Sequence, residues 1–371
     1  MNPNRPSSTA IAGFSLVEVM ISLSIGLVIL MGIISMLANS SRSQKDLDQA
    51  GQMLLNGHFA VNELYDDLRN AGYFGTHFFN SQTYPGTSAP DPCNTTDHAD
   101  LLYAMAMPVH GYRPASLNDV VDFSATSCAA LLTAANQQPG SDIVVVRRVE
   151  TQPLTGAGET GVIYLQANVT QAGILKNGAI THSIQDGTVT AGSATITKLD
   201  GTAAEIRKYR VHVYFVAPCS SGSGANGVCA AGDDTIPTLK RLELSVDGGV
   251  TTMIIIPLAE GVEAMKLKYG LDLVAGIVNL KDQTGLDGDG IPEPPFATTA
   301  TPWSQWNSVV AVQVYLLVRT PQSDTGQVDD KTYTLGDDIF GPFTGNNQYY
   351  KRHLFSSEVR LVNLAGPRSV E

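Results

Sequence analysis

Gly13-Phe14-Ser15-Leu16-Val17-Glu18 opens the stretch that decides the fold of this chain, and nineteen uncharged residues, 19–37, follow it. About twenty apolar residues match the hydrocarbon thickness of a bilayer, so the run predicts a membrane-spanning helix. An acidic side chain costs roughly 2.5–3.5 kcal/mol at the centre of such a helix and less near its end, where Glu18 lies. This cost indicates that Glu18 has a function and a partner.

The segment before the apolar run has the features of a leader. Residues 1–13 are hydrophilic and carry Arg5 but no acid. An ordinary secretory signal is cleaved after its apolar region, whereas here the small residue Gly13 precedes that region. Cleavage after Gly13 would remove the leader, keep the anchor and make Phe14 the new N-terminus. The alternative is a plain single-pass anchor with a chance glutamate at its edge.

The register of Gly13, Phe14, Glu18 and the apolar run resembles the class III leader of type IV pilins and type II secretion pseudopilins. This resemblance implies that a prepilin peptidase cuts after Gly13 and N-methylates Phe14. The amine of a neighbouring subunit would then be a ready partner for Glu18, the assembly carboxylate. The motif alone fits a pilin or a pseudopilin.

Length and charge fit an anchored extracytoplasmic protein. The 371 residues can form the anchor plus one large domain or two smaller ones. A net charge of −12 argues against a broad nucleic-acid-binding surface, because phosphate binding relies on Lys and Arg, and leaves only a local basic patch open. The basic leader should stay cytoplasmic. We therefore expect a single pass through the inner membrane, with the head in the periplasm.

Four cysteines agree with an oxidising compartment. Cys219 and Cys229 bracket a Ser- and Gly-rich loop that a disulfide could close, and we expect this bridge. Cys93 and Cys128 then remain as the second pair, although four cysteines permit three connectivities. A zinc site is the alternative, but no pair has Cys-x2-Cys spacing and no cysteine has a histidine at ligand spacing.

The helical pattern continues beyond the apolar run. Apolar residues recur at steps of three, four or seven, which places them on one helix face: Leu47, Ala50, Leu54, Val61, Leu64, Tyr65 and Leu68. We expect a helix from Phe14 to Asn70 that stops at Gly72 and bends or partly melts at Gly51 and Gly57. Two separate helices with a linker are the alternative.

Beyond residue 72 the pattern changes to short strands. The predicted strands are 143–149, 162–166, 209–217, 239–246, 253–256, 262–271, 309–319 and 354–362. Several alternate strictly between apolar and polar residues, which predicts antiparallel sheet with one covered face. We expect the Gly- and Thr-rich segment 151–201 to be a hairpin-rich insertion that decorates this sheet. Residues 73–138 have little periodicity.

These patterns divide the chain into five regions. They are a cleaved leader (1–13), the transmembrane and assembly half of the helix (14–38), its periplasmic half (39–72), an irregular connection (73–141) and a β-rich head with insertions (142–371). The predicted class is α+β. A long N-terminal helix packed on an antiparallel head, the ladle shape of pilins, is also what the resemblance implies.

Later sequence blocks narrow the resemblance. The chain is similar to the PilW-type minor pilins in these blocks: Leu68-Arg69-Asn70-Ala71-Gly72-Tyr73-Phe74-Gly75, Leu267-Lys268-Tyr269-Gly270, the acidic loop near Asp287, Trp306 with strand 309–319, and Arg352-His353-Leu354-Phe355-Ser356-Ser357-Glu358-Val359-Arg360-Leu361. Thr76 departs from the pattern, because relatives often carry cysteine there.

The loop from Asp282 to Glu293 is a candidate calcium site. Calcium takes six to eight oxygens, and Asp287, Asp289 and Glu293 fall at positions three, five and nine of an EF-hand-like loop. Positions one and twelve hold Gly285 and Phe296, so two usual ligands are missing. The alternative is an Asp-Gly turn between strands. We expect no other cofactor.

The sequence gives little sign of catalysis. The seven histidines are scattered, and His212 lies in an alternating strand where packing or exposure explains it better than a ligand role. No nucleophile elbow, P-loop or His-Glu-x-x-His motif occurs. We therefore expect a protein that is not an enzyme.

Two functions follow from the resemblance. The first is a minor pilin that acts in pilus biogenesis within a membrane-anchored initiating or tip complex, supporting adhesion, twitching motility or DNA uptake. Its expected partners are other minor pilins, the major pilin, prepilin peptidase and the inner-membrane assembly machinery, and its final location is the pilus tip. The second is a pilus-borne adhesin whose loops 80–140 and 150–200 contact surfaces or DNA. A type II secretion pseudopilin is a variant of the first.

Overall fold

The computed structural model describes most of the chain. The described residues are 13, 15–76, 89–97, 100–101, 104–169, 180–186, 196–198, 200–272, 290–299 and 303–365. The chain divides into two compact units, Met1–Gly51 and Gln52–Glu371. Each unit is described by itself.

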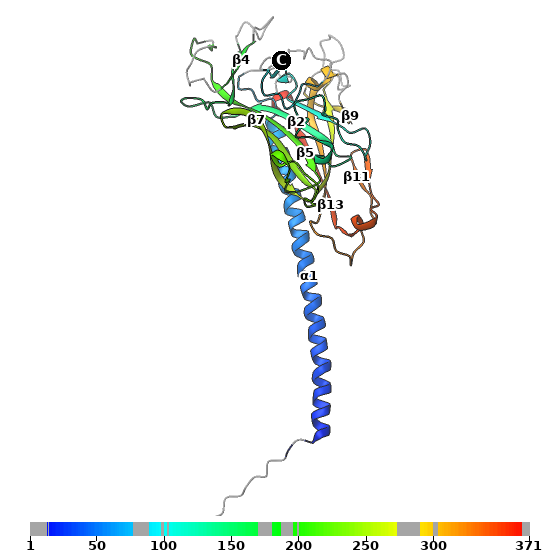
Figure 1. The fold of residues 1–371 in the computed structure, drawn as a ribbon. Coiled ribbons are helices and arrows are strands. Elements are labelled where there is room, and N and C mark those ends of the chain that lie inside the picture. The colour runs from blue at the N-terminus through cyan, green and yellow to red at the C-terminus, as the bar shows by residue number, and fades with distance from the viewer. Residues whose placement is uncertain are drawn as a thin grey trace, which may run out of the picture. The chain divides into compact units, whose positions relative to one another are not determined.

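A single helix, α1, runs without interruption from Leu16 to Asn70 (Figure 1). It ends because Gly72 adopts a left-handed conformation (φ +73°), which glycine tolerates and which turns the chain away. The Gly72 N–H donates to the Arg147 carbonyl at 3.0 Å. The predicted stop is confirmed, and the alternative of two helices with a linker is wrong.

The larger of the β-sheets has seven strands. Its path is β1-β2-β5-β3-β4, and β6 pairs with both β5 and β7. All of these pairings are antiparallel. The bounds are β1 Val109–Tyr112, β2 Ile143–Val149, β3 Ile163–Val169, β4 Ile180–Asp186, β5 Ile206–Ala217, β6 Thr238–Asp247 and β7 Val250–Glu260. The hairpin β3–β4 extends this sheet, so the segment 151–201 does more than decorate it.

The second sheet has four antiparallel strands in the order β13-β10-β8-β9, and β11 and β12 form a separate hairpin. The bounds are β8 Val262–Leu271, β9 Glu293–Ala297, β10 Val309–Arg319, β11 Tyr333–Leu335, β12 Asp338–Phe340 and β13 Arg352–Arg360. Short helices are η1 Ala134–Asn136, η3 Ala225–Gly227, η4 Trp303–Ser308, η5 Gly345–Tyr349 and α3 Val362–Ala365.

The central strands of the seven-stranded sheet are covered on both faces. On β5, Tyr214 and Val216 join a core that contains the last turns of α1 and the second sheet. The alternating residues Val213 and Phe215 join a different core, which contains both cysteine pairs. The expectation of one covered face is therefore wrong for these strands. Their continuous apolar runs, such as 143–146, are the pattern of a strand buried on both sides.

Both expected cysteine pairs are disulfides in the structure, Cys93–Cys128 and Cys219–Cys229. The first bridge closes the irregular segment that covers one face of the seven-stranded sheet. The second closes the exposed loop between β5 and β6. The zinc alternative is wrong, because a sulfur that is bonded to another sulfur is not a thiolate ligand.

Gly57 is a packing contact. A Cβ on Gly57 would lie 2.2 Å from Cε2 of Phe355 in β13, which is buried in the core around α1. A Cβ on Gly51 would have nothing within 4 Å among the described residues. The sequence predicts a bend or local melting at both glycines, but the helix is continuous through them. The absence of a side chain at Gly57 allows Phe355 of β13 to pack directly against the helix.

Gly57→Ala should lower the free energy of unfolding of the detergent-solubilised protein by about 1–2 kcal/mol, because overpacking outweighs the roughly 1 kcal/mol gained in helix propensity. Gly51→Ala, the matched control, should leave stability unchanged or raise it. Thermal and denaturant unfolding measure both. Equal effects of the two substitutions would contradict this role of Gly57.

Candidate functional site

The N-terminal part of α1 exposes its apolar side chains. Every large apolar residue of the stretch 16–37 is exposed, from 43% at Val19 to 77% at Leu16. By length and composition, α1 is the one helix among the described residues that could cross a membrane. These side chains need an apolar environment or apolar partners.

The serines of this stretch are compatible with such an environment. The Ser22 hydroxyl donates to the Val19 carbonyl at 3.0 Å, and the Ser24 hydroxyl donates to the Met20 carbonyl. Hydroxyl groups in lipid must be satisfied internally, and these bonds within the helix do so.

The structure places two of the three predicted processing and assembly residues. Gly13 lies just before α1, and Glu18 lies exposed in its first turn. The Glu18 N–H donates to the Ser15 carbonyl at 3.0 Å. A carboxylate in a first turn is favoured by the helix dipole. Phe14 lies outside the described residues.

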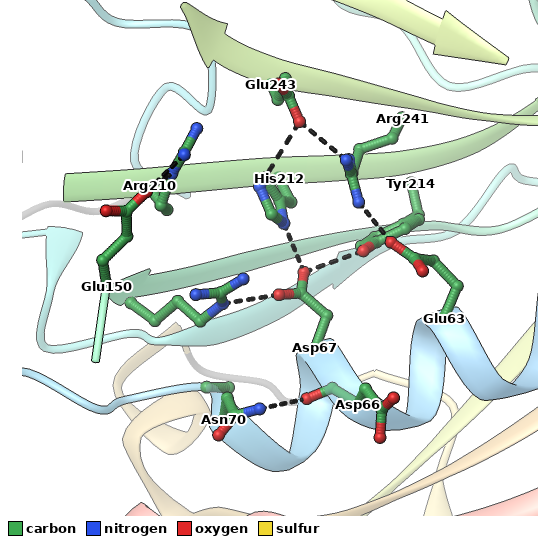
Figure 2. Close-up of polar contacts among 12 residues, drawn as sticks. Glu63, Asp66, Asp67, Asn70, Glu150, Arg210, His212, Tyr214, Arg241 and Glu243 are labelled. Atoms are coloured by element: carbon green, nitrogen blue, oxygen red, sulfur yellow. Dashed lines mark hydrogen bonds and ion pairs between the residues drawn. The ribbon is translucent and has the colours of Figure 1, made fainter. Parts of the chain in front are cut away.

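A buried carboxylate ties the last turns of α1 to the seven-stranded sheet. Figure 2 shows Asp67 pointing from the helix toward β5, where His212 Nδ1 lies 2.6 Å and the Tyr214 hydroxyl 2.9 Å from its Oδ2. Arg148 of β2 donates from Nε to Oδ1 at 2.7 Å. Asp67 is 5% exposed, so this carboxylate depends on those three donors.

The electrostatics of this carboxylate follow from its donors. Burial disfavours its ionised form, but the hydrogen bond from His212 and the charges of His212 and Arg148 lower the pKa of Asp67 well below its usual value. Burial and the Asp67 charge raise the pKa of Tyr214 well above its usual value. Asp67 is therefore ionised, and the Tyr214 hydroxyl keeps its proton and donates it.

A second layer of charges surrounds this carboxylate. Arg241 of β6 pairs with Glu63, one turn before Asp67 on α1, and with Glu243 at 2.8 Å. Glu243 Oε2 lies 3.8 Å from His212 Nε2 and so closes the network (Figure 2). We call these residues the helix anchor: Glu63, Asp67, Arg148, His212, Tyr214, Arg241 and Glu243. It holds one face of α1 against β2, β5 and β6.

The helix anchor is the part of the site that the sequence patterns miss. One signal could have found it, because Asp67 falls between Leu64 and Leu68 on the apolar face of α1. A buried carboxylate on such a face needs donors. His212, which the sequence assigns to packing or exposure, is buried and bonded to this carboxylate.

The predicted calcium ligands are not brought together within the described residues. Asp287 and Asp289 lie outside those residues, and Glu293 is the first residue of β9. The described residues contain no group of three or more His, Cys, Asp or Glu that could hold a metal ion. Calcium binding stays a prediction.

A comparison with protein families found a match. The family model PilW, described as type IV pilus-assembly protein W, matches residues 213–363. The matched residues make up less than half of the chain, so they show what this part of the chain is similar to. Comparisons with curated proteins and with solved structures found no match.

The PilW match covers the region from β5 to α3. It contains the second sheet and three members of the helix anchor, Tyr214, Arg241 and Glu243. The description of the matched family names type IV pilus assembly. An N-terminal apolar helix that could anchor in a membrane agrees with a pilus protein of the cell envelope.

Proposed function

We propose that this chain is a minor pilin that acts in type IV pilus biogenesis as part of a membrane-anchored initiating or tip complex. The observation that carries the proposal is the exposed apolar stretch 16–37 of α1 with Glu18 in its first turn. Prepilin peptidase would cut after Gly13 and methylate Phe14. The subunit would then wait in the inner membrane with its head in the periplasm.

Assembly would proceed by packing this helix against those of other pilins. Glu18 would pair with the N-terminal amine of a neighbouring minor or major pilin. Two unit charges roughly 4 Å apart interact by about 4 kcal/mol at an effective dielectric constant of about 20, against about 1 kcal/mol in water. Removal of the pair from water therefore makes it a strong contact between subunits.

The helix anchor supports this role because it joins the helix to the head. Its residues fix Glu63 and Asp67 of α1 to strands β2, β5 and β6. A subunit that enters a pilus by its helix must keep its head attached under load. Buried charge-assisted bonds resist such separation, because each broken bond leaves a buried charge without a partner.

Glu18→Ala should weaken co-purification with other minor pilins by more than about tenfold and reduce the number of surface pili, because the charge pair is lost in a low-dielectric setting. Glu18→Gln should behave alike, since it removes the charge and keeps the shape. Ser22→Ala is the matched control, because the Ser22 hydroxyl donates to the Val19 carbonyl of its own helix. If Glu18→Ala leaves co-purification and pilus number unchanged, the proposed pairing of Glu18 with a neighbour's N-terminal amine is wrong.

Deletion of the gene separates this proposal from that of a pilus-borne adhesin. Loss of all surface pili is the result expected of an assembly subunit. Normal piliation with loss of attachment would instead indicate an adhesin.

A further inference from the structure

A buried lysine lies against the Cys219–Cys229 disulfide. Lys240 of β6 is 1% exposed, and its Nζ lies 3.5 Å from Cys219 Sγ and 3.6 Å from Cys229 Sγ. Both cysteines are buried as well, with Cys219 at 2% and Cys229 at 6% exposed. The ammonium group therefore faces the bridge inside the protein.

The described residues offer this ammonium group no hydrogen bond beyond those two sulfurs. A disulfide sulfur is a weak hydrogen-bond acceptor. The nearby carboxylates are committed elsewhere: Asp233 accepts from the Ser223 and Ala230 amides, and Asp234 accepts from Ser220 and the Ser221 and Ile236 amides. Their charges act on Lys240 only at longer range, while burial lowers its pKa.

Reduction of the bridge would change this balance. A thiolate is a strong acceptor and carries the charge that the ammonium group lacks nearby, and cations beside a cysteine stabilise its thiolate. Stabilisation of the reduced form makes a disulfide a better oxidant. Lys240 therefore favours the reduced form of this bridge.

The second bridge has the opposite surroundings. The Cys93 N–H donates to the carboxylate of Asp91 at 2.9 Å, and the Ser127 N–H, next to Cys128, donates to the same carboxylate at 2.7 Å. The Asp91 carboxylate thus lies beside the backbone of both ends of this bridge, and a nearby anion disfavours a thiolate. Cys93–Cys128 is buried to a similar extent, so it is an internal control for the effect of Lys240.

We propose that Cys219–Cys229 is a site of thiol–disulfide exchange with a dithiol reductant, in which Lys240 stabilises the thiolate that forms. A thiolate of the dithiol attacks Sγ of Cys229, the more exposed of the two residues, and the S–S bond breaks. Cys219 leaves as a thiolate paired with Lys240. The second thiolate of the dithiol then attacks the mixed disulfide and releases Cys229, which takes up a proton.

The step balances in atoms and electrons. The dithiol becomes a disulfide and gives two electrons to the protein, whose bridge becomes one thiol and one thiolate. The dithiol loses two protons, of which Cys229 takes one and the solvent takes the other. Reduction would free the loop between β5 and β6 from its covalent closure.

The test uses the full-length protein in detergent, equilibrated with mixtures of reduced and oxidised dithiothreitol. After acid quenching, free thiols are alkylated and each cysteine is quantified by mass spectrometry. Cys219–Cys229 should be half reduced at a ratio of reduced to oxidised dithiothreitol about tenfold or more below that needed for Cys93–Cys128. Equal ratios for the two bridges would overturn the proposal.

Lys240→Met should raise the ratio needed for Cys219–Cys229 by about tenfold and leave Cys93–Cys128 unchanged, while Lys240→Arg should retain most of the wild-type behaviour. An unchanged ratio in a folded Lys240→Met variant would also overturn it. If Lys240→Met does not fold, the pH dependence of the wild-type bridge provides a second test of the proposal. Release of one proton predicts that its Cys219–Cys229 equilibrium shifts toward reduction by about tenfold per pH unit from pH 7 to 8, and an equilibrium independent of pH counts against the thiolate.

Discussion

Replacing Asp67 with alanine is expected to lower the free energy of unfolding by about 3–5 kcal/mol, the usual cost of removing one partner from a buried ion pair. The change leaves Arg148 and His212 without their carboxylate and the Tyr214 hydroxyl without its acceptor. Asp67→Asn keeps the volume but not the charge, so it should be destabilised as well. Denaturant unfolding of the detergent-solubilised protein measures both variants.

Asp66→Ala is the matched control for this result. Asp66 is the preceding residue of α1 and is exposed, and the bond that Figure 2 shows from Asn70 goes to its backbone carbonyl at 2.7 Å. A surface substitution of this kind should change stability by no more than about 0.5 kcal/mol. Similar losses for Asp66→Ala and Asp67→Ala would show that the helix anchor contributes little.

The pH dependence of stability should report the same carboxylate. Because folding lowers the pKa of Asp67, its stabilising effect is fully present above the unfolded pKa of about 4 and is lost as the pH falls toward the folded pKa. The wild-type protein should therefore lose more stability between about pH 4 and pH 2 than Asp67→Asn does. Parallel stability curves for the two proteins over this interval would contradict the shift.

Replacing Arg352 with methionine is expected to cost about 3–5 kcal/mol, because it removes the guanidinium that binds two buried carboxylates. Of these, Glu263 keeps an ion pair with Arg319 at 3.5 Å. The Arg352 guanidinium binds Glu263 of β8 through Nε at 2.6 Å and Nη2 at 3.1 Å, and Asp329 through Nη1 at 3.1 Å. It also lies 3.5 Å from the ring centroid of Phe343. The contacts join β13, β8 and the segment between β10 and β11. Thermal and denaturant unfolding check the loss.

Arg352→Lys separates charge from geometry at this position. A lysine keeps the charge but provides neither the planar fork nor the stacking on Phe343, so this variant should remain destabilised by about 1–3 kcal/mol. Arg360→Met, at the other end of β13, is the control, because Arg360 is exposed and its side chain donates to a backbone carbonyl, that of Gly290. Wild-type stability in Arg352→Lys would show that charge alone suffices there.

The parts of the fold that the sequence predicts are those set by local patterns. The helix ends at Asn70 as the period of three and four residues requires, and β2, β8 and β10 have the predicted bounds. Each of these elements reveals itself in a continuous apolar run or a strict alternation. The short strands β1, β9, β11 and β12 were not predicted, since three to five residues carry too little pattern.

The helix anchor could not be predicted because its contacts span the chain. Asp67 lies 81 residues from Arg148 and 145 residues from His212. No spacing within one element brings these side chains together. The sheet order does so, because it places β2 beside β5 over the last turns of α1.

The role of a glycine within a helix is also difficult to predict from sequence, because it depends on contacts with distant residues. Gly51 and Gly57 read alike as weak points of a helix, because the cost of glycine in a helix is a local property. Only the approach of Phe355, almost three hundred residues later, distinguishes them. Local propensity therefore gave the wrong reason for Gly57.

Because β2 and β5 are buried on both faces, each strand separates two cores. The side chains that face one core can change independently of those that face the other. Val144 and Val146 pack in the core that contains α1, whereas Val145 and Val149 pack in the core that contains the disulfides. Substitutions of the residues that face the disulfide-bearing core can change that core without weakening the packing of these strands against α1. Evolution can thus change the disulfide-bearing layer while the contacts of these strands with α1 stay the same.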